Sequence, residues 1–156
     1  MPTTSVQPPG SKTLLPTSTL FAVGLVAFGL TQSTLEEIIR GMYTILTHED
    51  VLITDYIAIA GIGAAFVNAG LVTLISIAIL KLVNDPLNGA TLVTIGLMAG
   101  FSLFGKNILN IWPILTGTAI YAMLKKETFS HHVNLALRAT ALSPVVSFMA
   151  VRYSPW

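Results

Sequence analysis

The sequence of 156 residues contains no cysteine, and only 10% of its residues are charged. The absence of cysteine excludes disulfides, thiolate metal sites and thiol catalysis. An average soluble domain has about 25% charged residues, so the low charge content argues against a soluble protein. The formal net charge of +1 provides no basic surface of the kind that binds nucleic acid, so we expect no nucleic-acid partner.

The few polar residues form no recognisable catalytic constellation. There is no Ser/His/Asp arrangement at a known spacing, no His-Glu-x-x-His motif and no phosphate-binding glycine loop. His131 and His132 are adjacent, so on a helix they point about 100° apart and cannot chelate one metal ion as an i,i+4 pair would. We therefore predict that the protein is not an enzyme, binds no cofactor and holds no metal.

Apolar residues, in contrast, make up 53% of the sequence, and the mean hydropathy is +0.77. A helix needs about 20 apolar residues to cross a bilayer. We predict an all-α, polytopic membrane protein with about five membrane segments in the lipid bilayer, some of them short or broken. The segments are expected at residues 14–32, 53–82, 89–104, 108–124 and 139–151.

The start of the chain differs in composition from the rest. Residues 1–12 hold three prolines, a glycine and several hydroxyl residues, which is typical of a disordered segment. We predict a disordered tail over residues 1–13, followed by a single helical membrane domain over residues 14–156.

Residues 33–47 change the hydrophobic period. Their apolar residues recur at helical spacing on one face, and Ser33/Glu36 and Thr34/Glu37 both have capping-box spacing. The pattern predicts an amphipathic helix in the membrane interface, or alternatively a helix packed on the protein's own surface. The apolar stripe consists of Leu35, Ile38, Ile39, Met42, Ile45 and Leu46.

One polar interruption divides the third and fourth segments, between Phe104 and Pro113. It contains Lys106, Asn107 and Asn110, with Gly105 before them. It is either a tight turn at the membrane surface, with the lysine reaching water, or an elbow where two half-length helices meet inside the membrane. The short third segment and the proline favour the elbow.

If the interruption is an elbow, its polar side chains are candidates for a substrate pathway. We predict that Asn68, Lys106, Asn107 and Asn110 line this pathway, because ionisable and amide groups at membrane depth are functional candidates. Asp55 is a candidate charge partner for the lysine, or alternatively a first-turn acid of its helix.

Small residues recur at four-residue spacing in two further segments, which favours close helix packing in lipid. One row contains Gly61, Ala65 and Ala69, and another contains Gly96 and Gly100.

The distribution of lysine and arginine over a five-span topology is only weakly asymmetric. Five basic residues fall on the side of the N-terminus and three, including Lys106, on the other. This excess places the N-terminus in the cytoplasm. A weak bias with an odd number of spans also suits two copies in opposite orientations, so we expect a homo-oligomer, such as an inverted dimer, or a second membrane chain as partner.

Two stretches carry a resemblance to a known family: residues 51–56 continuing into 61–70, and residues 104–107 continuing through 110–114. Together they resemble an uncharacterised family of prokaryotic polytopic membrane proteins, catalogued as a domain of unknown function. The resemblance covers most of the chain after the tail and supplies no activity. Members of that family are often more than twice this length, which implies that this chain matches one half and pairs with another. It also implies a prokaryotic inner membrane.

These observations lead to two functional hypotheses. The first is a membrane channel or secondary transporter for a small polar solute or ion, with its site near the Gly105–Asn110 break. The alternative is a non-transporting scaffold or accessory subunit that packs against partner helices through its small-residue faces. The depth of Lys106 distinguishes them, because a lysine open to bulk water marks a surface turn.

Overall fold

The computed structural model describes residues 11–51 and 53–153, and all regular secondary structure in these residues is helical. This confirms the predicted all-α class. Three stretches, Thr13–Gln32, Tyr56–Leu82 and Val133–Arg152, are long and apolar enough to cross a membrane. The α-helices are α1 (Ser11–Gln32), α2 (Leu35–Thr47), α3 (Tyr56–Leu82), α4 (Gly89–Phe101), α5 (Trp112–Lys125), α6 (Val133–Ala139) and α7 (Ser143–Arg152).

Five membrane segments can be recognised among these helices. They are α1, α3, the short helices α4 and α5, and the pair α6–α7, which the 3-10 turn Thr140–Leu142 interrupts. The amphipathic helix predicted over 33–47 is α2. Of the predicted disordered tail, residues 1–10 lie outside the described residues, and residues 11–13 form the start of α1.

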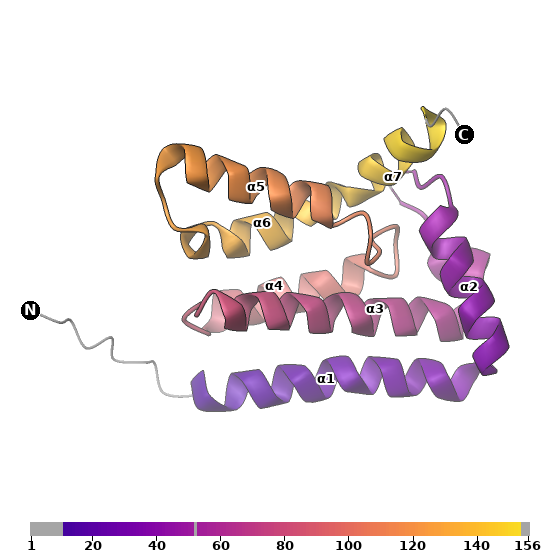
Figure 1. Ribbon diagram of the computed structural model, residues 1–156. Helices are drawn as coiled ribbons and strands as arrows, with labels where there is room; N and C mark the ends of the chain where they lie inside the picture. The colour runs from indigo at the N-terminus through magenta and orange to yellow at the C-terminus, as the bar shows by residue number, and fades with distance from the viewer. Residues whose placement is uncertain (1–10, 52, 154–156) are drawn as a thin grey trace, which may run out of the picture.

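The helices lie side by side along one direction, except α2, which crosses one end of the bundle (Figure 1). Helix α1 packs antiparallel on α3, α4 packs on α3 and also touches α1, and α6 lies beside α4 and contacts α5. We call the two ends of the bundle the α2 end and the opposite end.

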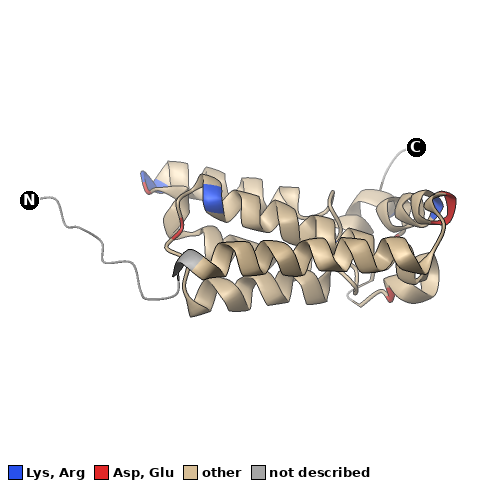
Figure 2. Cartoon of the chain, turned by 90° about the horizontal axis from the view of Figure 1, so that it is seen from below, with Lys and Arg blue, Asp and Glu red and all other residues tan. Residues whose placement is uncertain are grey.

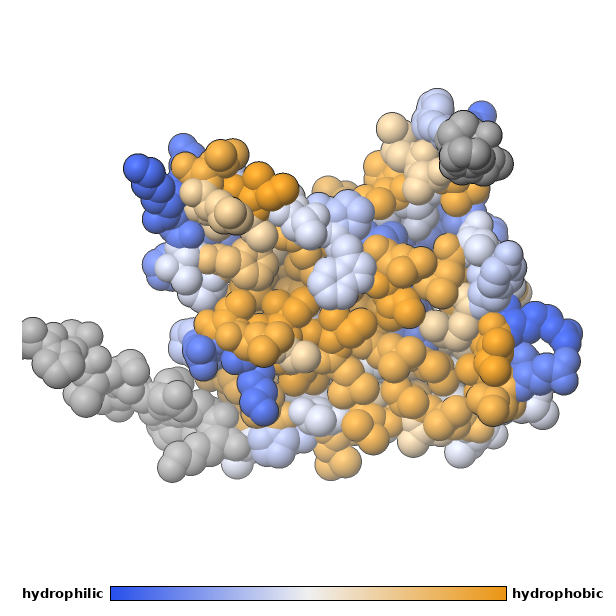
Figure 3. All heavy atoms as spheres, viewed as in Figure 1, coloured by the Kyte–Doolittle hydropathy of each residue, from blue (hydrophilic) through white to orange (hydrophobic). Residues whose placement is uncertain are grey.

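The charged residues gather toward the two ends of the helices (Figure 2). Between them, the face seen in Figure 3 is covered by hydrophobic side chains. A belt of this kind is expected where helices face lipid, because a charged side chain in the hydrocarbon region is costly.

Close contact between α1 and α3 depends on glycine. A methyl group on Gly29 would lie 2.6 Å from the carbonyl oxygen of Gly63, and one on Gly70 would lie 2.8 Å from that of Ala22. Each backbone therefore passes where a side chain would stand, which is typical of small-residue packing in membranes.

The glycines and alanines singled out in the sequence lie in different environments. Ala65 and Ala69 are fully buried. Gly61 breaks the helical path of α3, with φ of 83° and ψ of 160°. A methyl group on Gly61, Gly96 or Gly100 would meet no described atom within 4 Å. These three glycines therefore make no close helix contact within the described chain.

Helix α2 combines the two alternatives left open by its sequence. Its N-terminus is closed by a capping box of Thr34 and Glu37. Ile38 and Ile45 are buried on the face that packs against α3, whereas Ile39 is 62% exposed. One apolar face thus contacts the protein, and other apolar side chains remain free to enter the membrane interface.

Helices α4 and α5 are short and together form a hairpin. Asn88 caps α4 where α3 ends, and the 13 residues of α4 extend only about 20 Å, against a hydrocarbon core of about 30 Å. The chain then turns, and the 14 residues of α5 return to the opposite end (Figure 1). The side chain of Lys106, which the charge count had placed on the far side of the membrane, is buried within the chain, at 1% exposure.

A buried polar elbow as the candidate functional site

The elbow, residues 102–111, is a turn closed by two asparagines. The backbone N–H of Asn107 donates to Asn110 Oδ1, and the N–H of Asn110 donates to Asn107 Oδ1, each at 2.9 Å. Gly105 has φ of 99°, a conformation that residues with a side chain rarely adopt. Pro113 then starts α5, where its missing N–H is not needed.

Asn68 fixes the elbow against the middle of α3. It is the thirteenth of the 27 residues of α3 when Tyr56 is counted as the first. Its Nδ2 donates to the carbonyl oxygens of Ser102 at 2.8 Å and Lys106 at 2.9 Å. Both carbonyls would otherwise lack a partner, because α4 ends there. The elbow is therefore held inside the bundle.

Lys106 is buried without a counter-ion. Its Nζ lies 3.2 Å from Met98 Sδ and 5.4 Å from the centre of the Phe101 ring. No carboxylate of the described residues lies within ion-pair distance of it. The Oγ1 of Thr140 lies 3.3 Å from the same sulfur. Sulfur is a weak acceptor, so most of the amine's hydrogen-bonding capacity is unused.

On the α2 side, the elbow joins a chain of buried hydrogen bonds. Asn107 Nδ2 donates to Tyr56 Oη at 3.1 Å, and the tyrosine hydroxyl donates to Asp50 Oδ2 at 2.8 Å. Asn110 Nδ2 donates to Ser147 Oγ of α7 at 2.8 Å. The segment before α3, the elbow and α7 are thereby tied together.

Asp50 is fully buried in this chain of hydrogen bonds. Burial raises the pKa of its carboxyl group, and the hydroxyl of Tyr56 offsets part of that effect by hydrogen bonding. The buried carboxyl group therefore holds a proton more readily than an exposed aspartate.

A second polar group lies at the opposite end, between α3, α4 and α6. Asp85 accepts from Thr91 Oγ1 at 2.8 Å and from Asn134 Nδ2 at 2.9 Å. Thr94 Oγ1 lies 3.0 Å from Asn134 Oδ1, and Arg138 Nε donates to Thr94 at 2.9 Å. This group reaches the surface, because Arg138 is exposed.

Together these residues form a polar track from one end of the bundle to the other. One helical turn of α4 separates Thr94 from Met98, where Lys106 and Thr140 begin the inner part. A side chain is exposed at each end, Arg138 at one and His48 at the other, and the middle is buried. The track consists of Asp85, Thr91, Asn134, Thr94, Arg138, Thr140, Lys106, Asn68, Ser102, Asn107, Asn110, Ser147, Tyr56, Asp50 and His48.

The structure brings four of the five predicted pathway residues together at the elbow: Asn68, Lys106, Asn107 and Asn110. The fifth, Asp55, is exposed and acts as the N-cap of α3, accepting from the backbone N–H groups of Ile57 and Ala58. It forms no ion pair with Lys106 among the described residues. Asp55 therefore caps the N-terminus of α3, one residue before the first turn in which the sequence had placed it as an alternative.

Several members of the track were missed in the sequence. In the sequence, Asp50 is part of a polar turn, and Tyr56 lies near the start of the segment predicted over residues 53–82. A weak signal existed in α4, where Thr91, Thr94, Met98 and Ser102 recur at a spacing of three or four and line one buried face.

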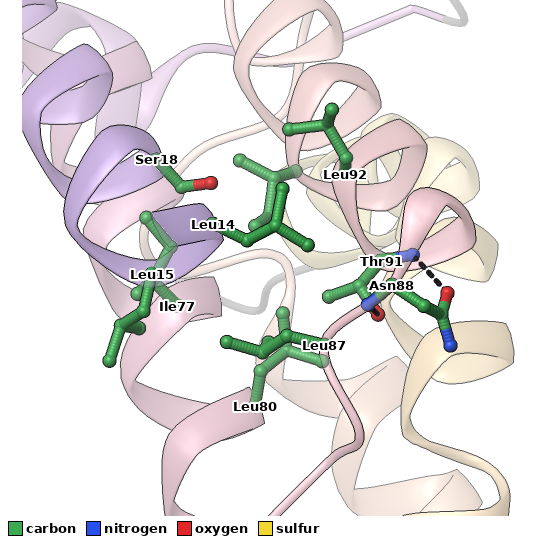
Figure 4. A pocket seen from close by; sticks show the side chains of 10 residues that line it. Leu14, Leu15, Ser18, Ile77, Leu80, Leu87, Asn88, Thr91 and Leu92 are labelled. Carbon is green, nitrogen blue, oxygen red and sulfur yellow. Dashed lines mark hydrogen bonds between the residues drawn. The ribbon is translucent and has the colours of Figure 1, made fainter. Parts of the chain in front are cut away.

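A pocket of different character lies between α1, the end of α3 and the start of α4 (Figure 4). It is lined mainly by leucine and isoleucine, and the buried Ser18 hydroxyl at its edge has no hydrogen-bond partner among the described residues. None of its lining residues belongs to the elbow. The described residues also contain no group of three His, Asp or Glu side chains that could hold a metal ion.

Comparison with known proteins gives one match. A family model described as a protein of unknown function (DUF1576) matches residues 34–154. No curated protein matches the chain, and neither does any solved structure. The matched residues include the elbow and every member of the polar track.

Proposed function

We propose that this chain, which belongs to the DUF1576 family of proteins of unknown function, is a channel or secondary transporter for a small polar solute or ion. Membership of that family assigns no activity. The proposal rests instead on one observation, the polar track that runs between the two ends of the bundle with an unpaired lysine at its centre.

The composition of the track is difficult to explain by stability alone. Buried amide and hydroxyl groups can strengthen a membrane protein through hydrogen bonds, by about 0.6 kcal/mol each on average. A buried ammonium group with no carboxylate partner costs free energy instead. Residues of this kind inside a membrane protein typically mark a path for ions, protons or substrates.

The hairpin of α4 and α5 places two helix ends beside the lysine. The C-terminus of α4 carries partial negative charge and the N-terminus of α5 carries partial positive charge, and both meet at the elbow. Half-length helices whose ends face a polar site within the membrane are a recurrent feature of transporters. The track is closed at Met98 and Phe101, so transport requires the elbow to move.

The charges at the two ends favour one orientation. With Lys106 buried, the end that holds the N-terminus has five basic residues, and the α2 end has Arg40 and Arg152. We propose that the N-terminus lies in the cytoplasm of a prokaryotic cell and that the chain resides in the inner membrane. The five residues are Lys12, Lys81, Lys125, Lys126 and Arg138.

A scaffold or accessory subunit is the second candidate, supported by one observation. Gly96 and Gly100 lie one turn apart on α4 and face open space. Such a pair allows a helix of another chain to approach closely, either a second copy, including an inverted one, or a different membrane protein. On this reading the polar track only holds the bundle together.

Cysteine accessibility in reconstituted vesicles separates the two candidates, because the chain has no cysteine of its own. We expect Asn134→Cys, on the track and partly exposed, to react with a membrane-impermeant thiol reagent and to lose flux of small ions or solutes once labelled. Leu135→Cys, on the same helix but outside the track, is the matched control and should keep its flux. Transport is ruled out if the unlabelled protein passes none of a panel of ions and small polar solutes.

A further inference from the structure

Two buried polar atoms near the α2 end face each other without hydrogen-bond partners. They are His48 Nδ1 and Asp50 Oδ1, which lie 3.5 Å apart. Neither atom has any other partner among the described residues. Unpaired buried polar atoms are rare and costly, and a single proton between these two would satisfy both.

The pair also connects bulk water with the inner track. His48 is the C-cap residue of α2, and its side chain is 38% exposed. Asp50, next to it, has a fully buried side chain. The other carboxylate oxygen of Asp50 accepts the hydrogen bond from Tyr56. A proton that arrives from water at the histidine therefore has the carboxylate as its next acceptor.

We propose that His48 and Asp50 form a proton-binding site, and that its occupancy is transmitted to the elbow through Tyr56 and Asn107. Binding takes one proton from water onto the carboxylate of Asp50, and the resulting O–H group donates to Nδ1 of His48 across the 3.5 Å gap. Release breaks that bond and returns the proton to water at the exposed edge of the histidine.

The neighbouring charged side chains point away from His48 and Asp50 or pair with other residues. Glu49 turns outward and pairs with Arg152 at 3.5 Å. The nearest titratable group of α3 is Tyr56, which is a hydrogen-bond donor to the carboxylate. The amine of Lys106, on the elbow, points to Met98 and makes no ion pair with Asp50 among the described residues.

The coupling part of the inference rests on the proposed transport function. The Tyr56 hydroxyl has one proton to donate and gives it to Asp50, while it accepts from Asn107. When Asp50 loses its proton, the buried charge draws these donors closer, because hydrogen bonds to ionised groups are shorter and stronger. Asn107 is one half of the asparagine pair that closes the elbow, so protonation and elbow geometry change together.

The test is infrared difference spectroscopy of the full chain in lipid nanodiscs between about pH 4 and 9. We expect a carbonyl band of one buried protonated carboxyl group in the wild type, and its loss in Asp50→Asn. Glu49→Gln, which alters the neighbouring carboxylate, is the matched control and should keep the band. His48→Leu should move its midpoint to lower pH by about one unit, a tenfold change in proton affinity, because the protonated carboxyl group of Asp50 then loses the acceptor for its hydrogen bond.

Some outcomes would overturn the proposal. A band that survives Asp50→Asn, or a carboxyl group that is ionised over the whole pH range, removes the proton site. If Asp50→Asn does not give a monodisperse protein, Tyr56→Phe replaces it. That variant should raise the midpoint, since the tyrosine hydrogen bond lowers the pKa of Asp50, and an unchanged midpoint counts against the site.

Proton flux in vesicles carrying a pH-sensitive dye then tests the coupling separately. Flux that is lost in Asp50→Asn and kept in Glu49→Gln supports it. A carboxyl band without any proton flux leaves the proton site standing and refutes the coupling, whereas the transport function is refuted only if the panel of ions and small polar solutes also shows no flux.

Discussion

Replacing Lys106 by methionine tests whether the buried amine serves stability or function. Methionine is unbranched and of similar length, so it fills the same space without the charge. We expect Lys106→Met to raise the stability of the protein and to abolish flux. If Lys106 served packing alone, the substitution would not combine a gain in stability with a loss of flux.

The size of the stabilisation follows from the partners of the amine. A cation above an aromatic ring gains about 0.5–2 kcal/mol, and the sulfur of Met98 is a weak acceptor. Removing an ammonium group from water costs several kcal/mol, and no carboxylate lies near enough to offset this cost. The substitution should therefore stabilise the fold by about 1–3 kcal/mol, which is comparable with the gain found when buried ion pairs are replaced by apolar residues of similar volume.

Unfolding in a fixed mixture of detergent and lipid measures the stability, and vesicle flux measures the function. Lys125→Met is the matched control, because Lys125 also lies above an aromatic ring, with its Nζ 6.0 Å from the centre of the Tyr121 ring, but is exposed. It should change stability by less than about 0.5 kcal/mol. The reasoning fails if Lys106→Met destabilises the protein, and an unchanged flux would remove the lysine from the pathway.

Two further substitutions address the geometry of the elbow. Asn68→Ala removes two hydrogen bonds to backbone carbonyls and should cost about 1–3 kcal/mol in an unfolding assay. Ser76→Ala on the same helix should be nearly neutral, because that hydroxyl bonds only within its own helix, and an equal loss in both would mean that Asn68 does not hold the elbow. Gly105→Ala should cost at least about 1 kcal/mol, because φ is 99° and the new methyl group would lie 2.9 Å from a proline ring. The control is Gly117→Ala, in an open helical position, which should stabilise the protein by up to about 1 kcal/mol. If Gly105→Ala were neutral, the turn would tolerate a side chain and the reasoning would be wrong.

The helices were largely predictable because their signals are local. Neighbouring residues in the sequence are enough to predict where these helices begin or end. Examples are the caps Thr34 and Asn88 and the end of α3 at Leu82. Hydrophobic length identified α4 as too short to cross a membrane. The hairpin path follows from that length together with the charged turn after α5.

The depth of the elbow could not be predicted from its own residues. A surface turn and a buried elbow need the same glycine and asparagines, and the difference is set by Asn68, which lies 34 and 38 positions from the residues it binds. Asp50 was missed for the same reason, because it becomes buried only when α7 and the elbow close over it. The spacing of Gly96 and Gly100 likewise predicts a packing row but does not show that the row faces outward.

The hairpin of α4 and α5 has a consequence for how the chain enters the membrane during synthesis. Neither helix is long enough to insert on its own, and the elbow carbonyls find their partner only on α3. Insertion of α3 must therefore precede that of the hairpin, and α4 and α5 must enter as a pair. A nascent chain that stalls after α4 would expose the unpaired elbow to lipid, and we expect it to be a substrate for membrane quality control.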